Sequence, residues 1–122
     1  MYNTSEEEID KCFTTMEGKP LIHNNEPMNE GNYGGMVYDK CMSKAGYLGN
    51  LVVFPKKKDM TMKNICHEAF HVLSSINDAC DLERMYNGRN EHQAYLMGWI
   101  CDCINKARLG IGDFVELKDK DE

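Results

Sequence analysis

The clearest hydrophobic pattern in the chain lies between residues 61 and 78 and predicts an amphipathic helix. Thr61 is a suitable N-cap, because its side-chain oxygen can accept a hydrogen bond from a backbone amide of the first turn. Apolar residues recur at intervals of three and four, which aligns them on one stripe of a helix. They are Ile65, Ala69, Val72, Leu73 and Ile76. The opposite stripe carries His67, His71, Ser74, Ser75 and Asp78. A solvated helix face usually carries Lys and Glu, so two histidines here indicate a cleft.

The first half of the chain predicts a short helix, a long loop and a β-hairpin. Ser5 is a candidate N-cap for a helix that runs through Met16, and the Asn-, Gly- and Pro-rich stretch 24–35 is typical of an irregular loop. Residues 36–38 and 51–54 are β-branched or aromatic, and two glycines lie between them. We therefore expect these two segments to pair as strands of a hairpin.

The last predicted helix begins after Asn90 and ends at Gly110. Its middle, residues 94–101, is apolar nearly all round, so we expect this helix at the centre of the domain. Ala94 and Gly98 are small and four residues apart, which would let another helix approach closely. The fold class expected is α+β, with a small antiparallel hairpin or sheet packed on the 61–78 helix and on a central C-terminal helix. Residues 1–122 form one domain, with a variable N-terminal helix and loop over 1–33 and an acidic tail over 113–122.

Composition narrows the classes of function. The 122 residues are 42% hydrophobic, enough for one domain with its own core. A formal net charge of -6 argues against non-specific binding of nucleic acid and against anionic membranes. No apolar run approaches the roughly 18 residues that span a bilayer, and the acidic N-terminal segment does not resemble a signal peptide. The cytoplasm is the expected location, where the six cysteines would be reduced.

The candidate chemistry is the motif His67-Glu68-Ala69-Phe70-His71, an HExxH sequence. A spacing of four residues puts both imidazoles on one helix face, one turn apart, where they can hold a single cation. Glu68 is offset around the helix, so it can reach a water at that cation without being a ligand. This is the arrangement of a zinc metallopeptidase, in which the glutamate is the general base.

A catalytic zinc site needs a third protein ligand. The downstream candidates are Asp78, Asp81, Glu83, Glu91, His92 and Asp102. Glu91 is favoured because it opens the last helix and shares a face with Ala94 and Gly98, which would pack against the HExxH helix. His92 is the second choice. The sixth residue after His71 is Asn77 and not His, which excludes the metzincin pattern.

HEAFH followed by Glu91-His92-Gln93-Ala94-Tyr95 resembles a small gluzincin, and more narrowly the ImmA/IrrE-type metallopeptidases. The chain resembles more closely short phage-encoded metallopeptidases, on residues 49–53 and 91–100. The resemblance covers residues 34–105 and implies zinc ligands His67, His71 and Glu91, with Glu68 as the catalytic base. Larger gluzincins often place an Asp four residues after the ligand Glu to orient a histidine, but this chain has Tyr95 there. That orientation would come from elsewhere, for example Asp102 or a backbone carbonyl.

The expected function is zinc-dependent hydrolysis of a polypeptide substrate or protein target, in the cytoplasm or carried by a phage. Tyr95, Tyr38 and His23 are candidate donors to the oxyanion, and the sequence does not choose among them. The 51–54 strand is a candidate partner for an extended substrate. Two alternatives remain open. One is a catalytically inactive zincin-fold protein that works by binding, and the other is a structural zinc clip completed by Cys66 or His92. The oligomeric state is left open.

Overall fold

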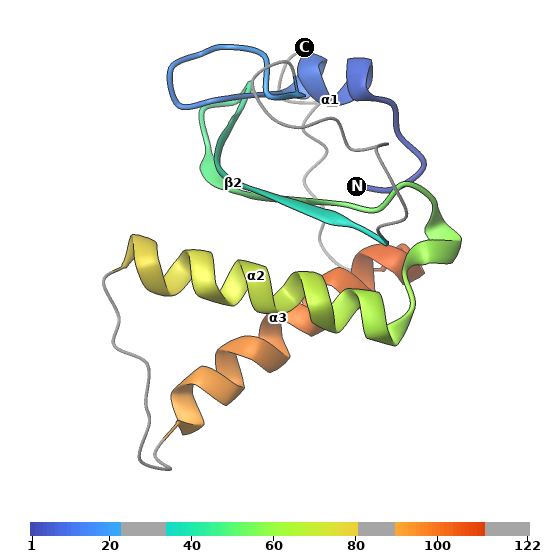
Figure 1. The fold of residues 1–122 in the computed structure, drawn as a ribbon, viewed down its shortest axis with the longest axis vertical. Coiled ribbons are helices and arrows are strands. Elements are labelled where there is room, and N and C mark those ends of the chain that lie inside the picture. The colour runs from blue at the N-terminus through green and yellow to red at the C-terminus, as the bar shows by residue number, and fades with distance from the viewer. Residues whose placement is uncertain (23–33, 81–89, 112–122) are drawn as a thin grey trace.

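The computed structural model describes residues 1–22, 34–80 and 90–111, which form layers of helix, sheet, helix and helix (Figure 1). A short helix lies on one face of an antiparallel sheet, and the long helix α2 lies on the other face with α3 against it. Within these residues the architecture is α+β, as predicted. The elements are α1 (Glu6–Cys12), β1 (Phe13–Thr14), β2 (Met36–Ser43), β3 (Leu48–Val53), the 3-10 helix η2 (Lys57–Asp59), α2 (Met62–Ala79) and α3 (Glu91–Leu109).

The β2–β3 hairpin is confirmed, and both strands are longer than predicted. Met36 pairs with Val53 and Met42 with Leu48, so the connection shortens to residues 44–47. Gly46 has a φ of 90°, a left-handed conformation that a side chain would disfavour. The register shifts between Tyr38 and Cys41, which marks a bulge in β2.

The first helix is shorter than predicted. Ser5 caps it as expected, by accepting a hydrogen bond from the Glu8 backbone N–H at 3.2 Å. Helical geometry stops at Cys12, because Phe13 adopts extended backbone angles and pairs with Ser43 as part of β1. Burying the Phe13 side chain in the core stabilises the fold more than extending the helix to Met16 would, because Met16 is exposed.

Two hydrophobic clusters lie on opposite faces of the sheet. Side chains alternate between the faces of a strand, so Tyr38 and Leu51 face α1 while Val37 and Val52 face α2. The α1-side cluster comprises Ile9, Phe13, Leu21, Ile22, Tyr38, Cys41, Leu51 and Val53. The α2-side cluster comprises Phe54, Met60, Ile65, Ala69, Val72, Leu73, Ile100 and Ile104. The predicted apolar stripe of the 61–78 helix is therefore confirmed as the packing face of α2.

The expectation that the last helix is central is wrong. Of α3, only Ile100 and Ile104 are buried, whereas Tyr95 is 74% and Trp99 62% exposed. A Cβ added at Gly98 would have nothing within 4 Å, so the predicted close approach at that position does not occur. A helix that is apolar nearly all round offers several possible packing faces. The longer Leu96, Met97 and Ile104 side chains bury more apolar area than Ala94 and Gly98 would, and α3 packs on α2 through them as an outer layer.

The N-terminal residues cover the outer edge of β3. The Met1 ammonium donates to the Val52 carbonyl at 2.7 Å, and the Phe54 N–H donates to the Met1 carbonyl at 2.8 Å. Burial lowers the pKa of this ammonium to about 6. None of the helices described is long and apolar enough to cross a membrane. The predicted acidic tail, 113–122, and residues 24–33 of the predicted loop lie outside the described residues.

Candidate functional site

The polar stripe of α2 and the first half of β2 enclose a pocket of about 680 Å³. Gly34, Gly35, Met36, Val37 and Asp39 line one wall. The other wall belongs to α2 and comprises Lys63, Asn64, His67, Glu68, His71, Ser74, Ser75 and Asp78. The cleft expected from the two histidines on the polar stripe is therefore present.

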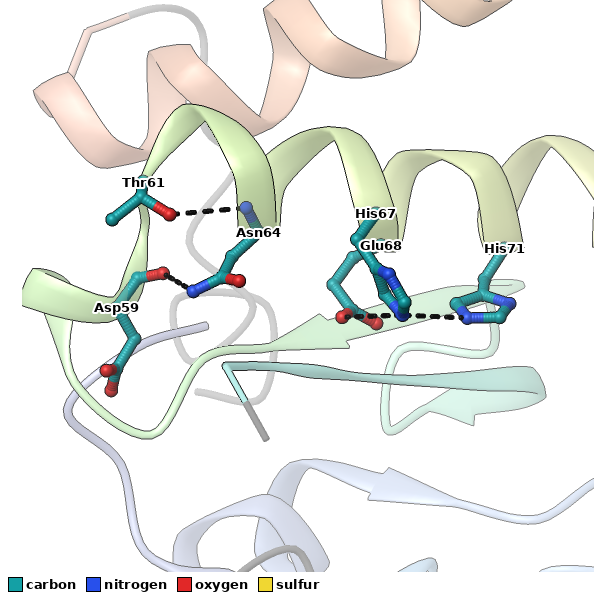
Figure 2. Close-up of polar contacts among 6 residues, drawn as sticks. All are labelled: Asp59, Thr61, Asn64, His67, Glu68 and His71. Atoms are coloured by element: carbon teal, nitrogen blue, oxygen red, sulfur yellow. Dashed lines mark hydrogen bonds and ion pairs between the residues drawn. The ribbon is translucent and has the colours of Figure 1, made fainter. Parts of the chain in front are cut away.

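His67, Glu68 and His71 all point from α2 toward the strands (Figure 2). The Nε2 atoms of the two histidines face each other across 3.3 Å. In a tetrahedral site with Zn–N bonds of about 2.0–2.1 Å, two nitrogen ligands lie about 3.3–3.4 Å apart. The imidazole pair therefore fits the spacing that one zinc ion requires.

Glu68 is buried at the floor of this pocket, with 5% of its surface exposed. Its Oε2 atom lies 4.0 Å from His67 Nε2. Burial raises the pKa of the Glu68 carboxyl, because the charged form loses its hydration, and the two imidazoles partly oppose the rise. A carboxyl that holds a proton closer to neutral pH is suited to general acid–base chemistry.

Local contacts fix the entry into α2. The Thr61 hydroxyl accepts from the Asn64 backbone N–H at 3.2 Å, which confirms the predicted N-cap. The Asn64 amide in turn donates to the Asp59 carbonyl at 2.8 Å (Figure 2). Gly34 lies against this amide, and a Cβ there would overlap it. The absence of a side chain at Gly34 therefore allows the start of β2 to approach the first turn of α2.

The structure does not bring a third predicted ligand to the histidine pair. Within residues 1–22, 34–80 and 90–111, no group of three or more His, Cys, Asp or Glu side chains is arranged to hold a metal ion. Glu91 is exposed at the start of α3. The first turn of α3 meets α2 through a 2.7 Å hydrogen bond from Asn77 to Gln93. Asn77 lies six residues beyond His71, or about 9 Å along the helix axis.

The other candidate ligands that the structure describes are also apart from the histidine pair. Asp78 lines the pocket about two turns beyond His71. His92 is exposed, and Asp102 pairs with Lys106 on α3 at 3.1 Å instead of orienting a histidine. Asp81 and Glu83 lie outside the described residues.

Of the predicted oxyanion donors, the two that the structure describes do not line the pocket, and neither does Cys66, a candidate ligand of the alternative zinc clip. Tyr38 is buried on the α1 side of the sheet, Tyr95 is exposed on α3, and His23 lies outside the described residues. The Cys66 thiol neighbours Cys101 of α3 and does not line the pocket. Burial, and then this neighbouring thiol, raises the pKa of Cys101. All six cysteines are free.

The strand that was expected to pair with a peptide substrate lies away from the pocket. Residues 51–54 do not line the pocket, and the outer edge of β3 is bound by Met1. The pocket is bordered by β2 instead. Among the described strands β1 pairs with β2 only at Met42 and Ser43, so the edge of β2 from Met36 to Asp39 has no described strand beside it.

Sequence reasoning missed seven lining residues, of which Met36 and Val37 were predicted only as strand residues. Lys63 and Asn64 were detectable, since they precede His67 by four and three residues and so share its helix face. Gly34 and Gly35 offered a weaker signal, as a glycine pair directly before a strand. Asp39 offered none, because its place depends on which face of β2 meets α2.

Comparison with known proteins finds no family model, no curated protein and no solved structure that matches this chain.

Proposed function

We propose that this chain is a zinc-dependent peptidase of minimal zincin-like fold, in the manner of the gluzincins it resembles. The observation that carries the proposal is the pair of facing imidazole nitrogens, 3.3 Å apart, beside a buried glutamate in an open cleft. His67 and His71 would hold the ion. The cytoplasm or a phage particle is the location that goes with this proposal.

The residues of the chain divide the chemistry as follows. When bound, zinc supplies Lewis-acid polarisation of a water molecule and of the scissile carbonyl. Glu68 takes a proton from the water and returns it to the leaving amine. Its position beside His67, and its burial, keep the carboxylate aimed at the space between the imidazoles and the β2 wall.

The substrate would bind as an extended peptide along the edge of β2 near Met36 and Asp39, which has no strand beside it among the residues that the structure describes. Such an edge presents backbone N–H and C=O groups to an incoming strand, which gives affinity without sequence preference. Met36, Val37 and Asp39 border the same pocket as Glu68, so a peptide paired there would present its backbone to the imidazole pair. This replaces the predicted role of residues 51–54.

Glu91 remains the predicted third ligand. It would have to reach the imidazoles from the first turn of α3, which requires a different placement of that turn from the one described. Isothermal titration of zinc into Glu91→Gln and His92→Gln proteins tests this. If Glu91 is the third ligand, the Glu91→Gln protein binds zinc at least about 10-fold more weakly than the wild type, and the His92→Gln protein binds it equally well. Loss of a residue that supports a metal ligand typically weakens metal binding by this factor.

The function itself is tested with Glu68→Gln. Zinc content and cleavage of a denatured protein mixture are measured for the wild type and the variant, with Glu7→Gln on α1 as the matched control. A peptidase retains stoichiometric zinc in both variants and loses cleavage only in Glu68→Gln. Equal cleavage by the wild type and Glu68→Gln would contradict the proposal, and so would zinc-loaded wild type that cleaves nothing.

The second candidate is a zincin-fold protein that binds a partner or uses zinc as a structural clip. The absence of a three-ligand group among the described residues favours the partner-binding form, because a structural zinc clip would need four protein ligands. This candidate predicts that the protein cleaves no peptide, whether or not it binds zinc. Replacing Glu68 would then leave its function unchanged.

A further inference from the structure

The pocket is an elongated cleft with opposite charges at its two ends. Its α2 wall runs from Lys63 to Asp78, a span of about 22 Å at 1.5 Å per residue. An extended peptide rises about 3.3 Å per residue, so the cleft accommodates roughly seven residues. His71 lies near the middle of this span, and His67 and Glu68 lie about 6 and 7.5 Å from its Lys63 end.

The charged end groups face the cleft and are available to a ligand. Lys63, Asp39 and Asp78 are all exposed lining residues. No ion pair joins any of the three to another residue that the structure describes. Asp39 lies near the Asp78 end, because Asn50, which opposes the bulge next to Asp39, accepts a hydrogen bond from Ser75 at 2.8 Å.

The direction of a bound peptide follows from how β2 and α2 run. Gly34 contacts Asn64 near the start of α2, and Gly35 contacts Glu68 one turn on. Asp39 then lies near Ser75, so β2 and α2 run in the same direction along the cleft. Antiparallel pairing is slightly more stable per residue than parallel pairing. A peptide antiparallel to β2 would place its N-terminal part at Asp39 and Asp78 and its C-terminal part at Lys63.

We propose that the cleft selects extended peptides with a basic side chain on the N-terminal side of the bond at Glu68 and an acidic group on its C-terminal side. Asp39 and Asp78 contact the basic side chain, and Lys63 contacts the acidic group. This inference rests on the proposed function for cleavage, but peptide binding alone tests it.

The test uses three fluorescein-labelled octapeptides on one neutral background. The first has Lys at its second position and Glu at its seventh, the second has the two exchanged, and the third has Gln at both. Affinity for the zinc-loaded Glu68→Gln protein is measured by fluorescence anisotropy at low and high salt. The first peptide binds best at low salt, about 10-fold more tightly than the second, because exposed ion pairs each contribute modestly. The difference shrinks at high salt.

Charge exchange across the cleft provides the decisive variant. Adding Lys63→Glu and Asp78→Lys together leaves the net charge unchanged and reverses the preference, so the second peptide now binds better. The matched control pairs Lys44→Glu with Glu7→Lys, both outside the cleft, and keeps the original preference.

The outcomes separate this inference from the proposed function. Equal binding of all three peptides, no binding of any of them, or a preference unmoved by the exchange overturns the charge assignment, even if wild type cleaves protein. A preference that reverses as described supports the assignment, even if wild type cleaves nothing and the peptidase proposal fails.

Discussion

Gly35 lies so close to Glu68 that an added Cβ would be 3.0 Å from the Glu68 Cγ atom. The same Cβ would lie 3.1 Å from the ring of Phe54, which is almost wholly buried. The start of β2 and the buried glutamate are therefore packed so closely that a side chain at residue 35 would push its neighbours aside by a few tenths of an ångström. This contact couples the wall of the cleft to the position of the proposed base.

Gly35→Ala is expected to destabilise the fold and displace Glu68. Phe54 cannot move aside within the packed cluster, so Glu68 must give way, at a cost of about 1–3 kcal/mol for overpacking. Urea unfolding measures the loss, and cleavage should fall along with it. Gly49→Ala on β3 is the matched control, since a Cβ there meets nothing within 4 Å. Equal stability of the two variants would show that the contact is looser than described.

Glu68→Gln should stabilise the metal-free protein at neutral pH. The pKa of Glu68 is raised by burial in the folded state, so folding favours the protonated carboxyl. The folded protein therefore loses stability as pH rises above the usual glutamate value, and the neutral amide avoids this loss. Thermal unfolding at pH 4 and pH 7 should show a gain for the variant at pH 7 that shrinks at pH 4. A variant less stable than wild type at pH 7 would contradict this reasoning.

Zinc should raise the unfolding temperature of the wild type through the imidazole pair. At a free zinc concentration 100-fold above the dissociation constant, binding stabilises the folded state by about 2.7 kcal/mol. For a chain of this size that is on the order of 10 °C. His71→Ala should lose most of this shift, while Lys44→Ala retains it. Both variants keep all six cysteines, so zinc bound by thiols in the unfolded state affects them alike. An undiminished shift in His71→Ala would place the ion elsewhere.

Ile104→Ala and Trp99→Ala should differ strongly in stability. Ile104 is buried between α3 and α2, so truncation leaves a cavity and costs about 2–5 kcal/mol. Trp99 is 62% exposed on the other side of α3, and its replacement should cost less than about 1 kcal/mol. Chemical denaturation monitored by circular dichroism compares the two. A larger loss of stability in Trp99→Ala than in Ile104→Ala would indicate that α3 is central, as the sequence predicted.

The parts of the fold that sequence predicts well depend on local signals. The period of apolar residues in α2, its Thr61 cap and the hairpin each follow from residues close together in the chain. The histidine pair follows too, because a spacing of four on one helix is enough to bring the imidazoles together.

The remaining features depend on how distant segments meet. Rotation of α3 about its axis is set by packing on α2, and a helix with apolar residues nearly all round carries no pattern that selects the face. The choice of Glu91 assumed that Ala94 and Gly98 face α2, and that assumption fails. The edge of β2 was equally hidden, because its availability depends on where β1 pairs along that strand.

The exposure of Trp99 has a practical consequence for any laboratory that handles this protein. It is the sole indole in the chain, and it is already largely hydrated in the native state. Its emission should therefore change little when the polypeptide denatures. The same fluorophore, however, would report sensitively on anything that docks on the outer surface of α3.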